Sequence, residues 1–199
     1  MDGIRLGFAG RSTTWSLIRK LVFPEHVALR YVGNETDCLG LDLVIVEGYM
    51  ADLVRCSRVL VLNDPSIDGI IEAIITGLGL SELNMGIDVG NSRCGVIMLA
   101  NETPIIHVTL SLIRLIRIVR KLARRTTINL IIGTSPGVSN LVRDFVKSLD
   151  DVNVRVRVIN EDEAYGKKDL FRMRYPYLTV DELDGLVYAY TGLAVNAHG

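Results

Sequence analysis

The chain has 199 residues and a formal net charge of -1, and 49% of its residues are hydrophobic, 6% aromatic and 23% charged. This composition is that of an ordinary globular protein, and it excludes disordered, collagen-like and coiled-coil proteins. The length suits either one large domain or two small ones that each bury a core. No apolar run reaches the roughly 20 residues of a membrane span, and no secretory signal is evident, so we expect a cytoplasmic protein that does not enter membranes.

Three cysteines, Cys38, Cys56 and Cys94, are odd in number and show no C-x-x-C spacing. This pattern argues against both a disulfide framework and a cysteine zinc site, so we expect reduced cysteines in or near the core. The chain also has 17 Arg against 5 Lys and no Gln, which hints at a thermophilic source because thermophile proteins carry fewer thermolabile amides.

In the first 80 residues, short apolar runs alternate with helical patterns, which predicts a parallel sheet with crossover helices. The expected strands are 4–10, 27–32, 42–47 and 58–62, and the expected helices are 12–22 and 67–78. The glycines at 77 and 79 and the polar stretch after them predict a boundary near residue 82. We therefore expect an α/β protein with a small Rossmann-like domain of unknown ligand at 1–82 and a second domain at 83–199.

The second domain opens with a different pattern, an antiparallel meander of three strands whose turns lie at 90–92 and 101–104. Strands and helices then alternate to the end of the chain. The expected strands are 86–89, 94–100, 105–109, 128–132 and 154–159, and the expected helices are 111–125, 138–149 and 180–194. The order is βββαβαβα, with an acidic residue, Asp88, at the centre of the first strand.

This order and its central acid resemble the ribonuclease H-like superfamily, and within it the RuvC-type and YqgF-type Holliday-junction resolvases. The resemblance covers about residues 84–196. It implies a ribonuclease H-like domain that hydrolyses phosphodiesters of nucleic acid, with structured or branched DNA as the expected substrate, and that acts as a homodimer. Nucleases of this fold bring three or four carboxylates to one sheet edge, where they hold two Mg²⁺ or Mn²⁺ ions.

Asp88 is the first candidate ligand, because the strand Gly86-Ile87-Asp88-Val89-Gly90 is otherwise apolar and a lone Asp there is costly to bury. The alternative is an Asp that caps the turn at the strand end. The acidic run after strand 154–159 matches the acids that follow this strand in YqgF-type proteins, and Glu163 fits best, with Glu161 in reserve. The alternative for this run is a solvated turn.

The final helix carries Asp181 and Asp184, which are three residues apart and share one helical face. They match the acid-x-x-Asp pair that begins the last helix of RuvC-type enzymes. For Asp181 the alternative is helix capping, since Thr179 and Glu182 form a capping box and the helix dipole favours acids in the first turn. The resemblance thus implies catalytic, metal-holding roles for Asp88, Glu163 and Asp184, with Glu161 and Asp181 as auxiliary ligands.

One position departs from the RuvC pattern. RuvC-type enzymes have a Glu at the end of the fourth strand, whereas residues 130–137 contain no acid. The Gly- and Pro-containing turn at this point is typical of the YqgF branch. Three carboxylates with phosphate oxygens can still complete the shells of the ions.

Basic residues gather on one side of the predicted helix 111–125, opposite an apolar stripe. Of these we expect Arg114, Arg117, Lys121 and Arg124 to contact phosphates, whose neutralisation dominates affinity for nucleic acid. The alternatives are a solvated Arg-rich face or a subunit contact. Residues 1–80 carry a charge of -3 and residues 81–199 a charge of +2, so the basic surface belongs to the second domain.

Two other function classes stay open. The segment 88–93 also resembles the phosphate-binding turn of the actin-like kinases, which need two copies of this fold around a cleft. The chain could alternatively be a non-catalytic binding or scaffold protein of ribonuclease H-like fold. A serine-hydrolase elbow at 133–137 is unfavourable, because Pro136 lacks the N–H that an oxyanion hole needs and His198 stands at the chain end.

In the first domain, the Gly-containing turn at residues 7–14 leads into a helix N-terminus, a place that can bind an anion. It fits neither the P-loop nor the dinucleotide fingerprint. We expect helix capping by Ser12 or Thr13 instead.

Overall fold

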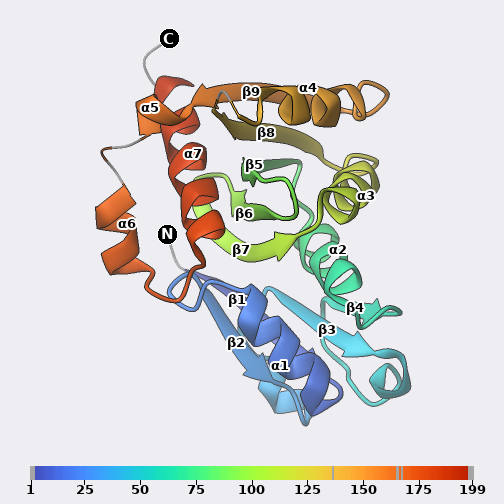
Figure 1. Ribbon diagram of the computed structural model, residues 1–199. Helices are drawn as coiled ribbons and strands as arrows, with labels where there is room; N and C mark the ends of the chain where they lie inside the picture. The colour runs from blue at the N-terminus through green and yellow to red at the C-terminus, as the bar shows by residue number, and fades with distance from the viewer. Residues whose placement is uncertain (1–2, 136, 165, 167, 197–199) are drawn as a thin grey trace. The chain divides into compact units, whose positions relative to one another are not determined.

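The structure is a computed structural model that describes residues 3–135, 137–164, 166 and 168–196 (Figure 1). It divides into two compact units, residues 1–80 and 81–199, each built on a sheet of its own. The α/β class predicted from the sequence is confirmed. In the part of the chain described, no helix is both long and apolar enough to cross a membrane.

The first unit is a four-stranded parallel sheet with the order β2-β1-β3-β4. The six predicted elements are present, and two short 3-10 helices lie between them. The elements are β1 (Ile4–Ala9), α1 (Ser12–Leu21), β2 (Val27–Tyr31), η1 (Glu35–Cys38), β3 (Leu43–Glu47), η2 (Gly48–Met50), β4 (Val59–Leu62) and α2 (Ile67–Leu78).

The ends of helix α2 follow from its sequence. The Ser66 hydroxyl accepts a hydrogen bond from the backbone N–H of Gly69 and caps the first turn. Gly79 ends the helix in the left-handed conformation, with φ of 65°, which glycine adopts at little cost.

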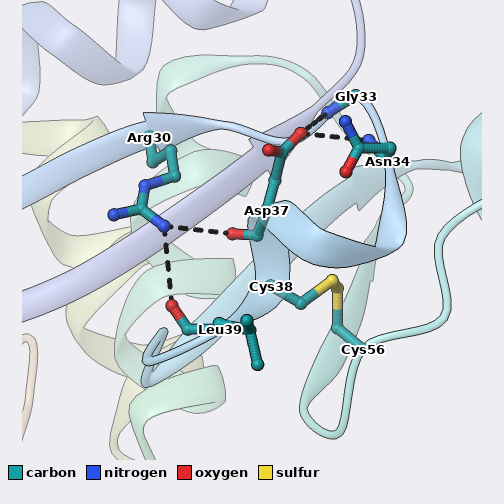
Figure 2. Close-up of a disulfide and its surroundings, with 7 residues drawn as sticks. All are labelled: Arg30, Gly33, Asn34, Asp37, Cys38, Leu39 and Cys56. Carbon is teal, nitrogen blue, oxygen red and sulfur yellow. Dashed lines mark hydrogen bonds between the residues drawn. A yellow bond between two sulfur atoms is a disulfide. The ribbon is translucent and has the colours of Figure 1, made fainter.

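The expectation of reduced cysteines is wrong for two of the three. Cys38 of η1 and Cys56 of the loop before β4 form a disulfide, with Cα atoms 5.6 Å apart (Figure 2). Both residues pack against the apolar cluster of Ala9, Val44 and their neighbours. An odd cysteine count leaves one thiol over and does not prevent the other two from pairing. Cys94 is that free and buried thiol.

The segment that carries Cys38 is ordered by its own hydrogen bonds. The Asp37 carboxylate accepts from the backbone N–H groups of Gly33 and Asn34, and the Arg30 guanidinium donates to the carbonyls of Asp37 and Leu39 (Figure 2). These hydrogen bonds hold the segment in the position in which Cys38 reaches Cys56.

The second unit has a five-stranded sheet with the order β7-β6-β5-β8-β9. Strands β5, β6 and β7 form the predicted antiparallel meander, and β8 and β9 run parallel to β5. The elements are β5 (Glu82–Val89), β6 (Cys94–Ala100), β7 (Thr103–Leu110), α3 (Leu112–Leu122), β8 (Thr127–Thr134), α4 (Ser139–Lys147), β9 (Val154–Asn160), α5 (Glu161–Ala164), α6 (Lys168–Arg174) and α7 (Val180–Asn196).

This order is the one that the ribonuclease H-like resemblance implies, with α5 and α6 added between β9 and the final helix. Helix α7 lies on one side of the sheet, and α3 and α4 lie on the other (Figure 1). Strand β5 is at the centre of the sheet, so its residues face α7 on one side and the α3 side on the other.

Candidate metal centre

Asp88 lies near the carboxyl end of β5, on the face that α7 covers. Its register partners are Gly95 in β6 and Gly133 in β8, so a glycine stands beside it on each neighbouring strand. The two neighbouring strands therefore place no Cβ directly beside Asp88.

The glycines of this face let helix α7 lie unusually close to the sheet. A Cβ added at Gly95 would overlap the backbone of Asp181, and one added at Gly86 would overlap the carbonyl oxygen of Gly185. A Cβ at Gly133 would overlap the ring of Tyr188. At Gly86, which precedes Asp88 by two residues, the missing Cβ makes room for the backbone of helix α7.

This close packing brings the two acids of α7 toward Asp88. The pKa of Asp88 is raised to about 6: burial is the largest cause, the carboxylates of Asp184 and Asp181 add to it, and the ammonium of Lys168 opposes them. Glu161 adds a smaller contribution in the same direction as the acids of α7. Asp88 is therefore half-buried among like charges.

Two cations that the sequence analysis did not single out hold the acids of α7. Lys168, the first residue of α6, places its Nζ 2.5 Å from Oδ1 of Asp184. Arg93, in the turn between β5 and β6, places its Nε 2.9 Å from Oδ2 of Asp181. In the sequence only their positions mark them. Arg93 lies in the turn that follows Asp88, and Lys168 lies between the predicted strand 154–159 and the final helix, which carries Asp184.

Of the two candidate ligands that follow β9, Glu161 and Glu163, the structure describes the side chain of one. Glu161 is exposed in the short helix α5 and acts on Asp88 through its charge. The side chain of Glu163 lies outside the described part of the structure. Among the side chains that are described, no three His, Cys, Asp or Glu residues form a group that could hold a metal ion.

The capping box predicted at the start of α7 is present. The backbone N–H of Thr179 donates to Glu182 (3.0 Å), and the N–H of Glu182 donates to the Thr179 hydroxyl (3.2 Å). The buried Glu182 carboxylate also lies 3.3 Å from Nδ1 of His107 and accepts from the Thr109 hydroxyl, both on β7. Glu182 therefore fastens the acid-bearing turn of α7 to the sheet.

The basic helix has the two faces that the sequence predicts. Leu115, Ile118, Val119 and Leu122 are buried, and Arg117, Lys121 and Arg124 are exposed, with Arg114 half-buried. Arg120 serves another purpose, because its guanidinium binds the Asp151 carboxylate and the carbonyl of Ser148. Helix α3 follows β7, whose carboxyl end lies at the same sheet edge as Asp88, so Arg114 is nearer that edge than Lys121.

The expected capping of α1 by Ser12 or Thr13 is wrong. The helix begins at Ser12, and its N-cap residue, Arg11, makes no side-chain cap. Instead Glu47, at the end of β3, accepts from the backbone N–H of Arg11 (3.1 Å) and from the Thr14 hydroxyl (2.5 Å), and pairs with the Arg11 guanidinium. Burial alone would raise the pKa of Glu47, but these hydrogen bonds outweigh it and lower the pKa.

The protein's own carboxylate therefore fills the anion position at this helix N-terminus. The described part of the first unit is an all-parallel sheet, and the antiparallel meander of the second unit is not repeated in it. The pair of equivalent folds that an actin-like kinase needs is thus not formed by these residues. Pro136 and His198, which bear on the serine-hydrolase alternative, lie outside the described residues.

No family model matches the chain, and no curated protein matches it. The solved structures include a similar one, T. thermophilus RuvC in complex with a Holliday junction substrate. It is 12% identical to this chain, the match covers 58% of this chain and 96% of that one, and the TM-score is 0.45. The chain is thus similar in part to a RuvC structure.

Proposed function

We propose that the second unit is a metal-dependent nuclease, with Asp88, Asp184 and Glu163 as ligands of Mg²⁺ or Mn²⁺ and with Asp181 and Glu161 as auxiliaries. One observation carries this proposal. Glycines of the sheet let α7 pack so closely that its acidic first turns face the half-buried Asp88. Burial and the neighbouring acids together raise the pKa of Asp88 to about 6. A protein rarely keeps such a repulsive group unless it serves function.

The donor set fits the metals that the proposal names. All the acids offer carboxylate oxygens, the hard ligands that Mg²⁺ and Mn²⁺ take, and no thiol or imidazole ligand for zinc is among them. A divalent cation would relieve the repulsion that raises the pKa of Asp88. When bound, such ions lower the pKa of a water and stabilise a departing oxygen.

The chain's own cations have defined parts in this proposal. The Lys168 ammonium holds Asp184 and the Arg93 guanidinium holds Asp181, so both acids are kept in place before a cation arrives. Once displaced from the acids, either cation lies beside the site and can neutralise a phosphate oxygen of nucleic acid. Arg114, Arg117 and Lys121 of α3, and Arg124 just after it, would contact phosphates further along the nucleic-acid strand.

The test is a Mn²⁺-dependent cleavage assay on branched and single-stranded DNA. We expect cutting by the wild type and a loss of roughly a hundredfold or more in Asp88→Asn and in Asp184→Asn, because each substitution removes one oxygen ligand. Asp144→Asn, an exposed acid of α4, is the matched control and should cut normally. Cleavage that survives Asp88→Asn would refute the metal-ligand assignment.

A second candidate, a non-catalytic nucleic-acid-binding protein of this fold, is favoured by the ion pairs themselves. With Asp184 neutralised by Lys168 and Asp181 by Arg93, the site has counter-ions without a metal. This candidate predicts salt-dependent DNA binding with no cleavage, and Lys168→Ala would then leave DNA intact in Mn²⁺. Under the nuclease proposal, Lys168→Ala should tighten Mn²⁺ binding because Asp184 loses its competing cation.

A further inference from the structure

A pocket of about 360 Å³ opens on the α7 side of the second sheet, toward the amino ends of the strands. Helix α7 runs over the sheet from the Asp88 end toward this pocket. At the start of the helix, Asp181 lies against Gly95 of β6, and near its end, Gly192 packs on Ile131 of β8. The pocket therefore shares a sheet face with the candidate metal centre and is separate from it.

The strand register explains why the pocket is polar on one wall. Asn84, Asn129 and Arg155 are register partners on β5, β8 and β9, and so they lie side by side in one row across the sheet. Glu82 precedes Asn84 by two residues and points to the same face. The next row contains Ile131 and, with Leu193 of α7, gives the pocket an apolar wall.

The polar row is joined by hydrogen bonds that leave one acceptor over. The Asn129 amide donates to Glu82 and to Asn84 Oδ1, and the Asn84 amide donates to the Asn101 carbonyl. Within the described residues, Asn129 Oδ1 accepts no hydrogen bond, and it is not among the fully buried unsatisfied atoms. It therefore offers an accessible acceptor in the pocket wall.

The charges of the pocket are separated but adjacent. Arg155 and Glu82 face each other with 3.8 Å between Nη1 and Oε1, wider than a hydrogen bond, and both side chains are about half exposed or more. The other cation, Arg157, donates to the Gly192 carbonyl at the end of α7 (2.6 Å). Arg155 and Glu82 are thus the charges best placed to meet a small molecule.

We propose that this pocket binds a free α-amino acid with an apolar side chain. An α-amino acid carries its ammonium and carboxylate on one carbon, so they can reach Glu82 and Arg155 together, with Asn129 Oδ1 as a further acceptor for the ammonium. The side chain would lie on Ile131 and Leu193. A simple anion would face the Glu82 carboxylate and a simple cation would face two guanidinium groups, so a zwitterion suits the site better than either.

The size of the pocket agrees with this ligand class. A volume of about 360 Å³ is at the lower end of the range for small-molecule sites, which favours one amino acid over a dinucleotide or a peptide. Among the described residues that line this pocket, none is a candidate metal ligand, so leucine binding and metal-dependent cleavage can be lost independently of each other.

The experiment titrates L-leucine into the full-length protein and follows the side-chain amide NMR signals of Asn84 and Asn129. We expect saturable shifts of both signals. Arg155→Ala and Glu82→Gln should each bind leucine at least about tenfold more weakly, because each loses one charge-assisted hydrogen bond. Arg143→Ala, an exposed arginine of α4, is the matched control and should bind as the wild type does.

Two analogues test the zwitterion directly. 4-Methylpentanoate lacks the amine and isopentylamine lacks the carboxylate, and each should bind at least about tenfold more weakly than leucine. Equal binding of either analogue, or no saturable shift with leucine, would overturn the proposal.

Discussion

At the scale of single residues, Asp88 is an acid whose pKa lies well above that of an Asp in water. Its folded pKa is about 6, whereas an Asp in an unfolded chain titrates near about 3.9. The folded protein thus binds the proton more tightly than the unfolded chain, so ionising Asp88 costs stability. This cost is absent below about pH 4, grows between pH 4 and pH 6, and is complete above pH 6.

Asp88→Asn removes the charge and keeps the shape, so we expect the variant to be more stable than the wild type at pH 7 to 8. The expected gain is roughly 1–2 kcal/mol after solvent screening is allowed for, and it should vanish at pH 4. Urea unfolding at several pH values without divalent cations measures it. A constant difference between the two proteins from pH 4 to pH 8 would contradict the raised pKa, and Asp144→Asn, at an exposed acid of α4, is the control variant.

Gly95 makes a second residue-scale prediction, because its missing Cβ is what admits the backbone of Asp181. Gly95→Ala should destabilise the second unit by roughly 1–3 kcal/mol, as overpacking does, and should weaken Mn²⁺ binding by moving α7 away from Asp88. Gly137→Ala is the control, since nothing lies within 4 Å of its added Cβ. Equal stability of the two variants in thermal unfolding would show that α7 is not seated by this glycine.

Residue identity alone singles out the acids of the candidate site but not their partners. Asp88 stands out as a charge in an apolar strand, and Asp184 as an acid beyond the first turn of a helix. Lys168 and Arg93 look like ordinary surface cations in the sequence, because only the tertiary fold brings α6 and the β5–β6 turn to the acids. The role of the Glu47 carboxylate at the start of α1 was not predicted for the same reason, because its partners Thr14 and Arg11 lie 33 and 36 residues away in the sequence.

At the scale of elements, the strands and the long helices were predicted within a few residues, and the short helices were not. The meander, the basic helix and the final helix all follow from apolar spacing and turn residues. Helices α5 and α6 have four and seven residues, too few for a helical period to emerge from the sequence. Because α6 was not predicted, the pairing of its first residue, Lys168, with Asp184 was not predicted either.

The anchor of α7 gives an element-scale prediction. Burial would raise the pKa of Glu182, but hydrogen bonds from His107, Thr179 and Thr109 outweigh it and lower the pKa. Its contribution to stability is therefore present above the unfolded value of about 4.3 and is lost as the pH falls through the lower folded value. Glu182→Gln should cost roughly 1–3 kcal/mol at pH 7, and this cost should shrink below about pH 4.

Guanidinium unfolding of Glu182→Gln at pH 7 and at pH 3 to 4 measures this effect. The exposed Glu102→Gln is the matched control and should unfold with the wild type at both pH values. A cost that is the same at both pH values would mean that the Glu182 charge does not stabilise the start of α7.

At the scale of the whole molecule, two units with separate sheets should respond separately to a local change, and the disulfide provides one. Its two cysteines are 18 residues apart, and both belong to the first unit. Sequence spacing could not show the pairing, because β3 and η2 must first fold to bring the loop of Cys56 to η1. The thermophilic source inferred from the Arg-rich, Gln-free composition stays a prediction.

Reduction should therefore loosen the first unit and leave the second unchanged. Closing a loop of this size is worth about 3 kcal/mol in the chain-entropy description, so a reductant, or Cys38→Ser with Cys56→Ser, should speed amide exchange in β1 and β3 up to about a hundredfold. Exchange in β5 and β8 should stay the same. The buried Cys94, whose pKa burial raises to about 11, should not react with thiol reagents in either state, so labelling counts only the two released thiols. Equal acceleration in both sheets would show that the two units unfold as one.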